Sequence, residues 1–314
     1  MNITMKSPVL LIAFNRPDFT SIVFETIRQY KPSKFYLAVN APRADREGEA
    51  QKCSEVRKIV EKIDWDCEVH TLFRDEHLQL KISVSSAITW FFENEEMGII
   101  LEDDIVPDPS FYIYCEHLLE YYKNDIRVGM ISGDNFGFGH RRNRNSYYYS
   151  LYSHIWGWAS WRRAWKGYDV YMKDYADFFS GHWLEDLFPD QKEFRFWKEN
   201  FDEVAFKGFE TWDFQWVYHN FKNGRLNIMP SVNLVKNIGF GEGAAHTVHP
   251  SPYANMKTEP LSFPLDHPKF FVRDLISDAY SKKTFIGSER LPWKNRFSPI
   301  RILNRLRSYL FGIK

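Results

Sequence analysis

The chain has 314 residues, of which 44% are hydrophobic and 26% charged, a composition typical of a globular protein rather than a disordered or fibrous one. Its 41 basic and 41 acidic side chains cancel, so we expect no nucleic-acid partner, because proteins of that class carry an excess of basic charge. Aromatic residues reach 18% and no run of 18 apolar residues occurs, so no transmembrane helix is expected.

Short apolar runs and amphipathic stretches alternate through the first hundred residues. The apolar runs predict strands at 9–14, 35–39, 67–73 and 98–101. The amphipathic stretches predict a helix beginning at Pro17 and helices at 47–63 and 80–95. This alternation predicts an α/β fold with a mostly parallel sheet that helices cover on both faces.

Polar side chains follow three of these strands. They are Asn15 and Arg16, then residues 40–43 with Asn40 and Arg43, and finally the acidic triplet Glu102, Asp103 and Asp104. Ligands of parallel sheets bind beyond the carboxyl ends of the strands. We therefore expect these three segments to form one binding site.

The second half of the chain is less regular. Its features are a basic loop at 140–144, a Trp-Gly-Trp block at 156–158, a helical stretch at 183–206 and a glycine-rich turn at 239–243. The basic loop is either a lid over a bound diphosphate or a solvated surface loop. Residues 247–268 contain five prolines, so we expect irregular structure there.

The last 25 residues change in character. Between Arg290 and Lys314 there are seven basic residues and no acidic one. After Pro299 the apolar residues recur at helical spacing, with arginines opposite, a pattern typical of a helix lying on an anionic membrane surface. A basic helix packed on its own domain or on a partner subunit is the alternative. We divide the chain into a domain at 1–268 and an extension at 269–314 that ends in this basic amphipathic helix.

Cysteine usage and the N-terminus bear on the compartment. Cys53, Cys67 and Cys115 are too few for a disulfide framework. Residues 1–8 lack the long apolar run and the cleavage site of a secretory signal. We expect a cytoplasmic protein, with the basic end placing it at the inner face of the cell membrane.

The acidic triplet is the strongest chemical signal. Three carboxylates at the end of a buried strand repel one another unless a cation lies among them. Mg²⁺ and Mn²⁺ prefer oxygen ligands, often one or two carboxylates together with substrate phosphates. A cation held there would neutralise a diphosphate and make it a good leaving group. The alternative is that the strand ends in solvated acids.

Asp213 is the candidate general base. It begins a helical aromatic segment with Trp212 and Phe214, and burial among aromatic rings would raise the pKa of its carboxyl. Glu210 is the alternative base. The structural alternative is that Asp213 caps or charges the first turn of the helix. The sequence has no G-x-S-x-G elbow, Walker A loop, G-x-G-x-x-G fingerprint or zinc spacing.

Residues 99–111, Ile-Ile-Leu-Glu-Asp-Asp-Ile-Val-Pro-Asp-Pro-Ser-Phe, resemble the acidic motif of glycosyltransferases of the GT-A fold. The pattern is similar to that of the N-acetylglucosaminyltransferase I family and of bacterial nucleotide-diphospho-sugar transferases. Residues 11–17, 156–158 and 212–213 also match, and the resemblance covers roughly residues 7 to 250. Asn40-Ala41 stands where bacterial relatives usually have Asp-Gly, and the tail after Leu261 has no counterpart.

The resemblance implies a Rossmann-like nucleotide-diphospho-sugar transferase domain and a role for each matching residue. Asp104 would coordinate Mn²⁺ or Mg²⁺ together with Asp103, which would also reach the ribose or sugar. Glu102 would contact the donor sugar and Arg16 the nucleotide, while the loop with Asn40 and Arg43 would help to bind the donor. Trp158 belongs to the block that would form the floor of the cleft. His246 would complete the metal shell from a late loop.

The predicted function is metal-dependent sugar transfer, with inversion, from a nucleotide-diphosphate sugar to a glycan or lipid-linked oligosaccharide. Bacterial surface polysaccharide synthesis, as in lipopolysaccharide, would use such a reaction. One alternative is a sugar-nucleotide nucleotidyltransferase, a class that usually has a glycine-rich loop with a lysine where this chain has Asn15-Arg16-Pro17-Asp18. The other is a non-catalytic carbohydrate-binding protein of the same fold.

Overall fold

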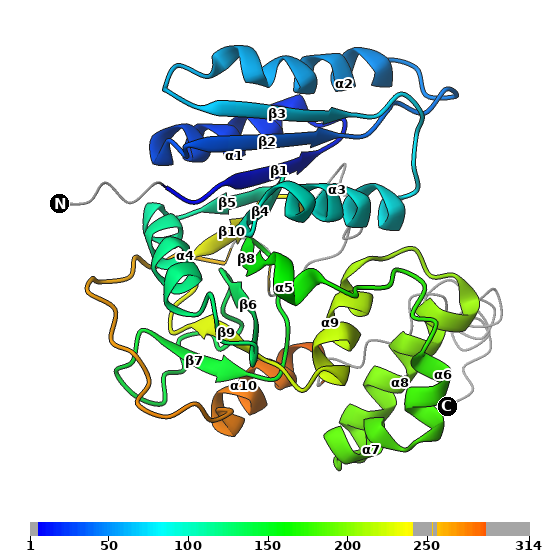
Figure 1. The fold of residues 1–314 in the computed structure, drawn as a ribbon, viewed down its shortest axis with the longest axis vertical. Coiled ribbons are helices and arrows are strands. Elements are labelled where there is room, and N and C mark those ends of the chain that lie inside the picture. Colours follow the sequence, from blue (N-terminus) through cyan, green and yellow to red (C-terminus); the bar gives the residue numbers. More distant parts are fainter. Residues whose placement is uncertain (1–5, 241–252, 254–255, 287–314) are drawn as a thin grey trace, which may run out of the picture.

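The computed structural model describes residues 6–240, 253 and 256–286. Its centre is an eight-stranded sheet with the strand order β3-β2-β1-β4-β8-β6-β9-β7, and a two-stranded sheet pairs β5 with β10 (Figure 1). The strands are β1 (Val9–Ala13), β2 (Lys34–Val39), β3 (Glu68–Phe73), β4 (Met97–Glu102), β5 (Ile105–Pro107), β6 (Val128–Ser132), β7 (Tyr147–Ser150), β8 (Trp158–Trp161), β9 (Leu226–Pro230) and β10 (Val235–Asn237).

The helices cover this sheet and form a separate lobe beside it. They are α1 (Pro17–Tyr30), α2 (Glu49–Arg57) continued by a 3₁₀ turn (Lys58–Lys62), α3 (Leu80–Asn94), α4 (Pro109–Tyr121), α5 (Arg162–Trp165), α6 (Tyr175–Ser180), α7 (Trp183–Leu187), α8 (Gln191–Lys207), α9 (Asp213–Lys222) and α10 (Leu275–Phe285). The elements predicted in the first hundred residues are all present, with ends shifted by a few residues.

The sheet is mostly parallel, which confirms the predicted α/β class. β3, β2, β1 and β4 run in the same direction. β8 pairs antiparallel to both β4 and β6, and β7 pairs antiparallel to β9. The apolar residues of β1 and β4 are buried on both sides because helices cover both faces.

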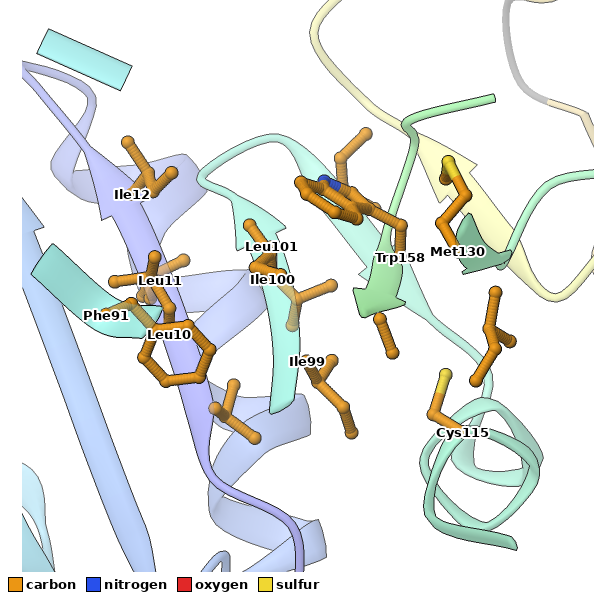
Figure 2. Close-up of a cluster of buried hydrophobic side chains, with 14 of the residues drawn as sticks. Leu10, Leu11, Ile12, Phe91, Ile99, Ile100, Leu101, Cys115, Met130 and Trp158 are labelled. Atoms are coloured by element: carbon orange, nitrogen blue, oxygen red, sulfur yellow. The ribbon is translucent and has the colours of Figure 1, made fainter. Parts of the chain in front are cut away.

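The helices α1 and α3 cover opposite faces of the sheet. The chain steps from β1 to β2 in one direction and from β3 back across to β4 in the other, so right-handed crossovers place their helices on different sides. The strands β1 and β4, the helix α3 and the Trp-Gly-Trp block share one core, to which they contribute Leu10, Ile100, Phe91 and Trp158 (Figure 2). This packing fixes the ends of β1 and β4 next to each other.

A lobe of helices lies beside the sheet and has an aromatic core of its own (Figure 1). Trp197 of α8 packs against Phe188 and Phe201, and its ring meets Phe221 of α9 edge-on at 5.1 Å. The predicted helical stretch at 183–206 is therefore two helices, α7 and α8, interrupted at Pro189. α9 belongs to both cores, so it joins the lobe to the sheet.

The described part of the C-terminal extension packs against the edge of the sheet. The Asp274 amide donates to the Tyr149 carbonyl over 2.8 Å, and the Ser150 hydroxyl donates to Asp278 over 2.5 Å. Residues 256–268 form neither helix nor strand, as predicted. The predicted basic helix at 290–314 lies outside the described residues. None of the described helices is both long enough and apolar enough to cross a bilayer.

Candidate functional site

The acidic triplet lies where the order of the sheet reverses. β1 has β2 on one side and β4 on the other, and in open α/β sheets the crevice for ligands forms at such a point, outside the carboxyl ends of the strands. Glu102 ends β4, and Asp103 and Asp104 form the turn that leads into β5. Arg16 follows β1 directly and reaches the same turn. The predicted meeting of these two segments is observed.

Arg16 is paired with two of the three acids. Its guanidinium contacts the Asp103 carboxylate, and its Nη1 lies 3.1 Å from Oδ2 of Asp104. The Phe14 amide also donates to Asp103 over 3.4 Å. Asp103 is only 3% exposed. Burial raises the pKa of its carboxyl to about 6, although the charge of Arg16 acts in the opposite direction.

Glu102 is the least compensated member of the triplet. Among the residues that the structure describes, none donates a hydrogen bond to its carboxyl. Burial, followed by the charges of Asp104, Asp103 and Asp213, raises its pKa to about 8. Because the charge of Asp213 contributes to this shift, Asp213 lies within electrostatic range of Glu102. The contacts observed at the end of β4 are those of Arg16 with Asp103 and Asp104.

The triplet is chemically suited to a hard divalent cation. The atoms that its side chains can offer to a ligand are carboxylate oxygens, which Mg²⁺ and Mn²⁺ prefer as ligands. Gly239, which follows β10, lies against Asp104, and a Cβ atom at Gly239 would come within 2.2 Å of the Asp104 Oδ2. The Ile238 amide donates to the Asp104 carbonyl over 2.8 Å. A glycine at this position thus keeps the Asp104 carboxylate accessible.

The third predicted metal ligand, His246, lies outside the described residues. Within the described ranges, no three His, Cys, Asp or Glu side chains are arranged as a complete metal site.

Asp213 and Glu210 differ in how they are held. Asp213 is the first residue of α9, and its Oδ1 accepts from the Thr211 hydroxyl and, over 2.9 Å, from the Phe214 amide. No described residue donates to its Oδ2. Glu210 forms an ion pair of 3.0 Å with Lys81 of α3. Each acid thus keeps one oxygen without a hydrogen-bond donor among the described residues, and the two differ in that the charge of Glu210 is paired with Lys81.

Asn40 and Arg43 hold the loop after β2. The Asn40 side chain donates to the Leu78 carbonyl over 2.8 Å and accepts from the Leu78 amide over 3.0 Å. Arg43 pairs with Glu49, the first residue of α2. Both residues thus have structural partners. The guanidinium of Arg43 also lies 5.6 Å from the ring of Phe14, so it remains at the border of the site.

Trp158 is a core residue. It is 1% exposed, and its ring stacks on Trp212 at 5.9 Å and packs against Trp216 at 5.6 Å. This is the packing role that aromatic residues commonly have, and it leaves no face of Trp158 for a donor. Trp156 of the same block is half-buried, and its ring meets Phe240, which follows Gly239, at 5.6 Å.

Two contributors to the site were not predicted from the sequence. Glu49 pairs with Arg43 and accepts from Asn15 over 2.8 Å, and these hydrogen bonds lower the pKa of Glu49 to about 2. Gly239 makes room for the Asp104 carboxylate. No periodic pattern marks such residues, because their partners are far away in the sequence.

The basic loop is tied to the C-terminal segment. Arg141 lies 3.1 Å from Glu259, and Arg142 lies 3.2 Å from Asp274 at the start of α10. These ion pairs occupy two of the arginines that were considered for a lid over the diphosphate.

No protein-family model and no curated protein matches the chain. Among solved structures, the chain is similar to HddC from Yersinia pseudotuberculosis, with 10% identity and a TM-score of 0.31 over 50% of this chain and 77% of that one. For HddC complexed with GMP-PN, the identity is 11% and the TM-score 0.32, over 52% of this chain and 80% of that one. Similarity at this level does not define a function, and the case for one depends on the site itself.

Proposed function

We propose that this protein is a metal-dependent glycosyltransferase that moves a sugar from a nucleotide-diphosphate donor to a glycan acceptor. The observation that carries the proposal is the pairing of Arg16 with Asp103 and Asp104, next to Glu102, at the reversal point of the sheet. Asp213 lies within electrostatic range of Glu102. A nucleotide, a diphosphate and a sugar are the ligand parts that such a charged edge would hold.

The residues of the triplet would divide the work of binding. Asp104, next to Gly239, would hold Mn²⁺ or Mg²⁺ together with Asp103. When bound, such a cation would neutralise the diphosphate and favour its departure. Glu102 would accept hydrogen bonds from donor hydroxyl groups, which would compensate its buried charge. Arg16 would keep Asp103 in place and offer its remaining N–H groups to the nucleotide.

Asp213 would act as the general base. In an inverting transfer the acceptor oxygen attacks the anomeric carbon, the bond from that carbon to the diphosphate oxygen breaks, and the hydroxyl proton passes to a carboxylate on the acceptor side. Asp213 is within electrostatic reach of Glu102 and has an oxygen without a hydrogen-bond donor among the described residues. The pairing of Glu210 with Lys81 makes Glu210 the weaker candidate.

The test is hydrolysis of nucleotide sugars without acceptor, measured on a panel of uridine and guanosine diphosphate sugars with Mn²⁺. Asp104→Ala should reduce turnover by at least about 100-fold, because it removes charge stabilisation at the leaving group. Asp66→Ala, a change at an exposed acid remote from the site, is the matched control. Equal rates for wild type and Asp104→Ala would reject the metal assignment.

The same panel separates the alternatives. A nucleotidyltransferase would release pyrophosphate from a nucleoside triphosphate and a sugar 1-phosphate, and would not transfer sugar to a glycan. A carbohydrate-binding protein without activity would turn over none of these compounds, with or without metal. The direct run from β1 through Arg16 into α1, without a glycine-rich loop, favours transfer.

A further inference from the structure

A hollow lies on the face of the sheet that carries α3. It is an open groove of about 620 Å³ between α3, the end of β3 and residues 168–173. This volume is within the range of about 300–1,000 Å³ that is typical of ligand sites. The groove is lined by different residues from the acidic cluster, and no sequence motif predicted it.

The lining combines aromatic rings with hydrogen-bonding groups. Trp90, Tyr168 and Tyr171 line the groove. Tyr171 is 56% exposed, although aromatic side chains usually bury their rings. Tyr168 is fixed by stacking on Trp165, with ring centres 4.1 Å apart. Rings held in this way offer apolar faces to a ligand at little entropic cost.

The charges of the groove balance. Arg74 and Lys173 line it together with Glu93 and Asp169. Because the numbers of basic and acidic side chains are equal, the groove has no net electrostatic attraction for a phosphate group or a polyanion. Hydroxyl groups, which both donate and accept hydrogen bonds, can use both kinds of side chain. Apolar ring faces combined with balanced polar groups fit the C–H faces and hydroxyl groups of a neutral saccharide.

One wall of the groove is attached to the segment that carries the candidate base. The Tyr168 hydroxyl donates to the Trp212 carbonyl over 2.8 Å, and the Gln215 side chain donates to the Val170 carbonyl over 3.2 Å. Lys81, which pairs with Glu210, lies 5.9 Å from the ring of Tyr171. A ligand along this wall would therefore extend toward the start of α9.

We infer that this groove binds the acceptor, a neutral oligosaccharide, with Tyr171 as its exposed aromatic platform. The acceptor role depends on the proposed function, whereas binding of a saccharide does not. The groove would hold sugar units remote from the reacting hydroxyl, so that its residues set acceptor preference and do not touch the donor.

The experiment is binding of the fluorescently labelled full chain to an array of neutral oligosaccharides. Wild type should bind at least one of them, and Tyr171→Ala should weaken that binding at least tenfold. Tyr171→Phe keeps the ring and should stay within about threefold of wild type. Tyr121→Ala is the matched control, because Tyr121 is 61% exposed on α4, outside the groove.

Two outcomes would overturn the inference: no binding of any oligosaccharide by wild type, or equal binding by wild type and Tyr171→Ala. Thermal shifts with nucleotide sugars and Mn²⁺ distinguish this failure from failure of the proposed function. Tyr171→Ala should keep the wild-type shift, since it leaves the acidic cluster intact. Saccharide binding without any donor shift would overturn the acceptor role.

Discussion

Asp103 and Glu102 are neighbours whose charges are compensated differently. Arg16 pairs with Asp103, and burial raises the pKa of Asp103 only to about 6. Glu102 accepts no hydrogen bond from the described residues, and burial raises its pKa to about 8. An added cation or sugar hydroxyl groups would therefore stabilise the charged form of Glu102 more than that of Asp103.

At the residue scale, Asp213→Asn separates binding from transfer. The amide keeps the size of the side chain and can still accept from the Phe214 amide, but it cannot take a proton. We expect the thermal shift with donor and Mn²⁺ to remain and transfer to fall by about 10²–10⁴-fold, the usual contribution of a general base. Full transfer activity in this variant would move the role to another residue, with Glu210→Gln as the next test.

At the scale of elements, α9 connects the two cores and carries a buried histidine. The His219 Nε2 donates to the Ala164 carbonyl in α5 over 3.0 Å, and its ring stacks on Trp216 at 5.5 Å. Its Nδ1 is buried without a hydrogen-bond partner among the described residues. Burial, followed by the charge of Arg225, lowers the pKa of His219 to about 4. The neutral ring is therefore the form that holds α9 against α5.

This packing predicts a pH dependence of stability. Because the pKa of His219 is lower in the folded state than its value of about 6.5 in the unfolded chain, its contribution is complete above pH 6.5 and is lost as the pH falls toward 4. The loss should reach roughly 3 kcal/mol. Urea unfolding at pH 7 and pH 4 should show a larger fall for wild type than for His219→Gln, which cannot titrate. Equal falls would contradict the assignment.

At the scale of the whole molecule, the C-terminal segment returns to the far edge of the sheet. α10 is held there by Asp274 and Asp278, while β7 forms a bridge from Tyr149 to Arg273. The chain continues from α10 into the basic stretch at 290–314, which the sequence predicts to lie on an anionic membrane. Under the proposed function, such an attachment would bring a lipid-linked acceptor to the protein.

The attachment can be tested with vesicles. Full-length protein should sediment with vesicles that contain about 30% phosphatidylserine, and a chain ending at Glu289 should stay in solution. Each basic residue near such a surface contributes about 1 kcal/mol, so raised salt should release the full-length protein. Zwitterionic vesicles are the control. Equal sedimentation of both chains would remove the membrane interaction.

The sequence by itself determined the parallel half of the sheet, because apolar runs such as residues 9–13 and 98–101 are buried between two layers of helices. It also placed Arg16 and the acidic triplet at strand ends, and it predicted that Asp213 begins a helix. Local patterns carry this information, because a strand, the polar residues that follow it and the start of the next helix are each determined by neighbouring residues in the sequence.

Only the tertiary structure decided which of these residues meet. The antiparallel insertion of β8 buries Trp158, which the sequence assigned to the donor site, and the pairing of β10 with β5 brings Gly239 to Asp104. The same long-range packing brought Asp213 within electrostatic range of Glu102 and formed the groove beside α3. Such contacts join residues that are far apart in the sequence, such as Ile100 with Trp158 and Asp104 with Gly239, and no local period records them.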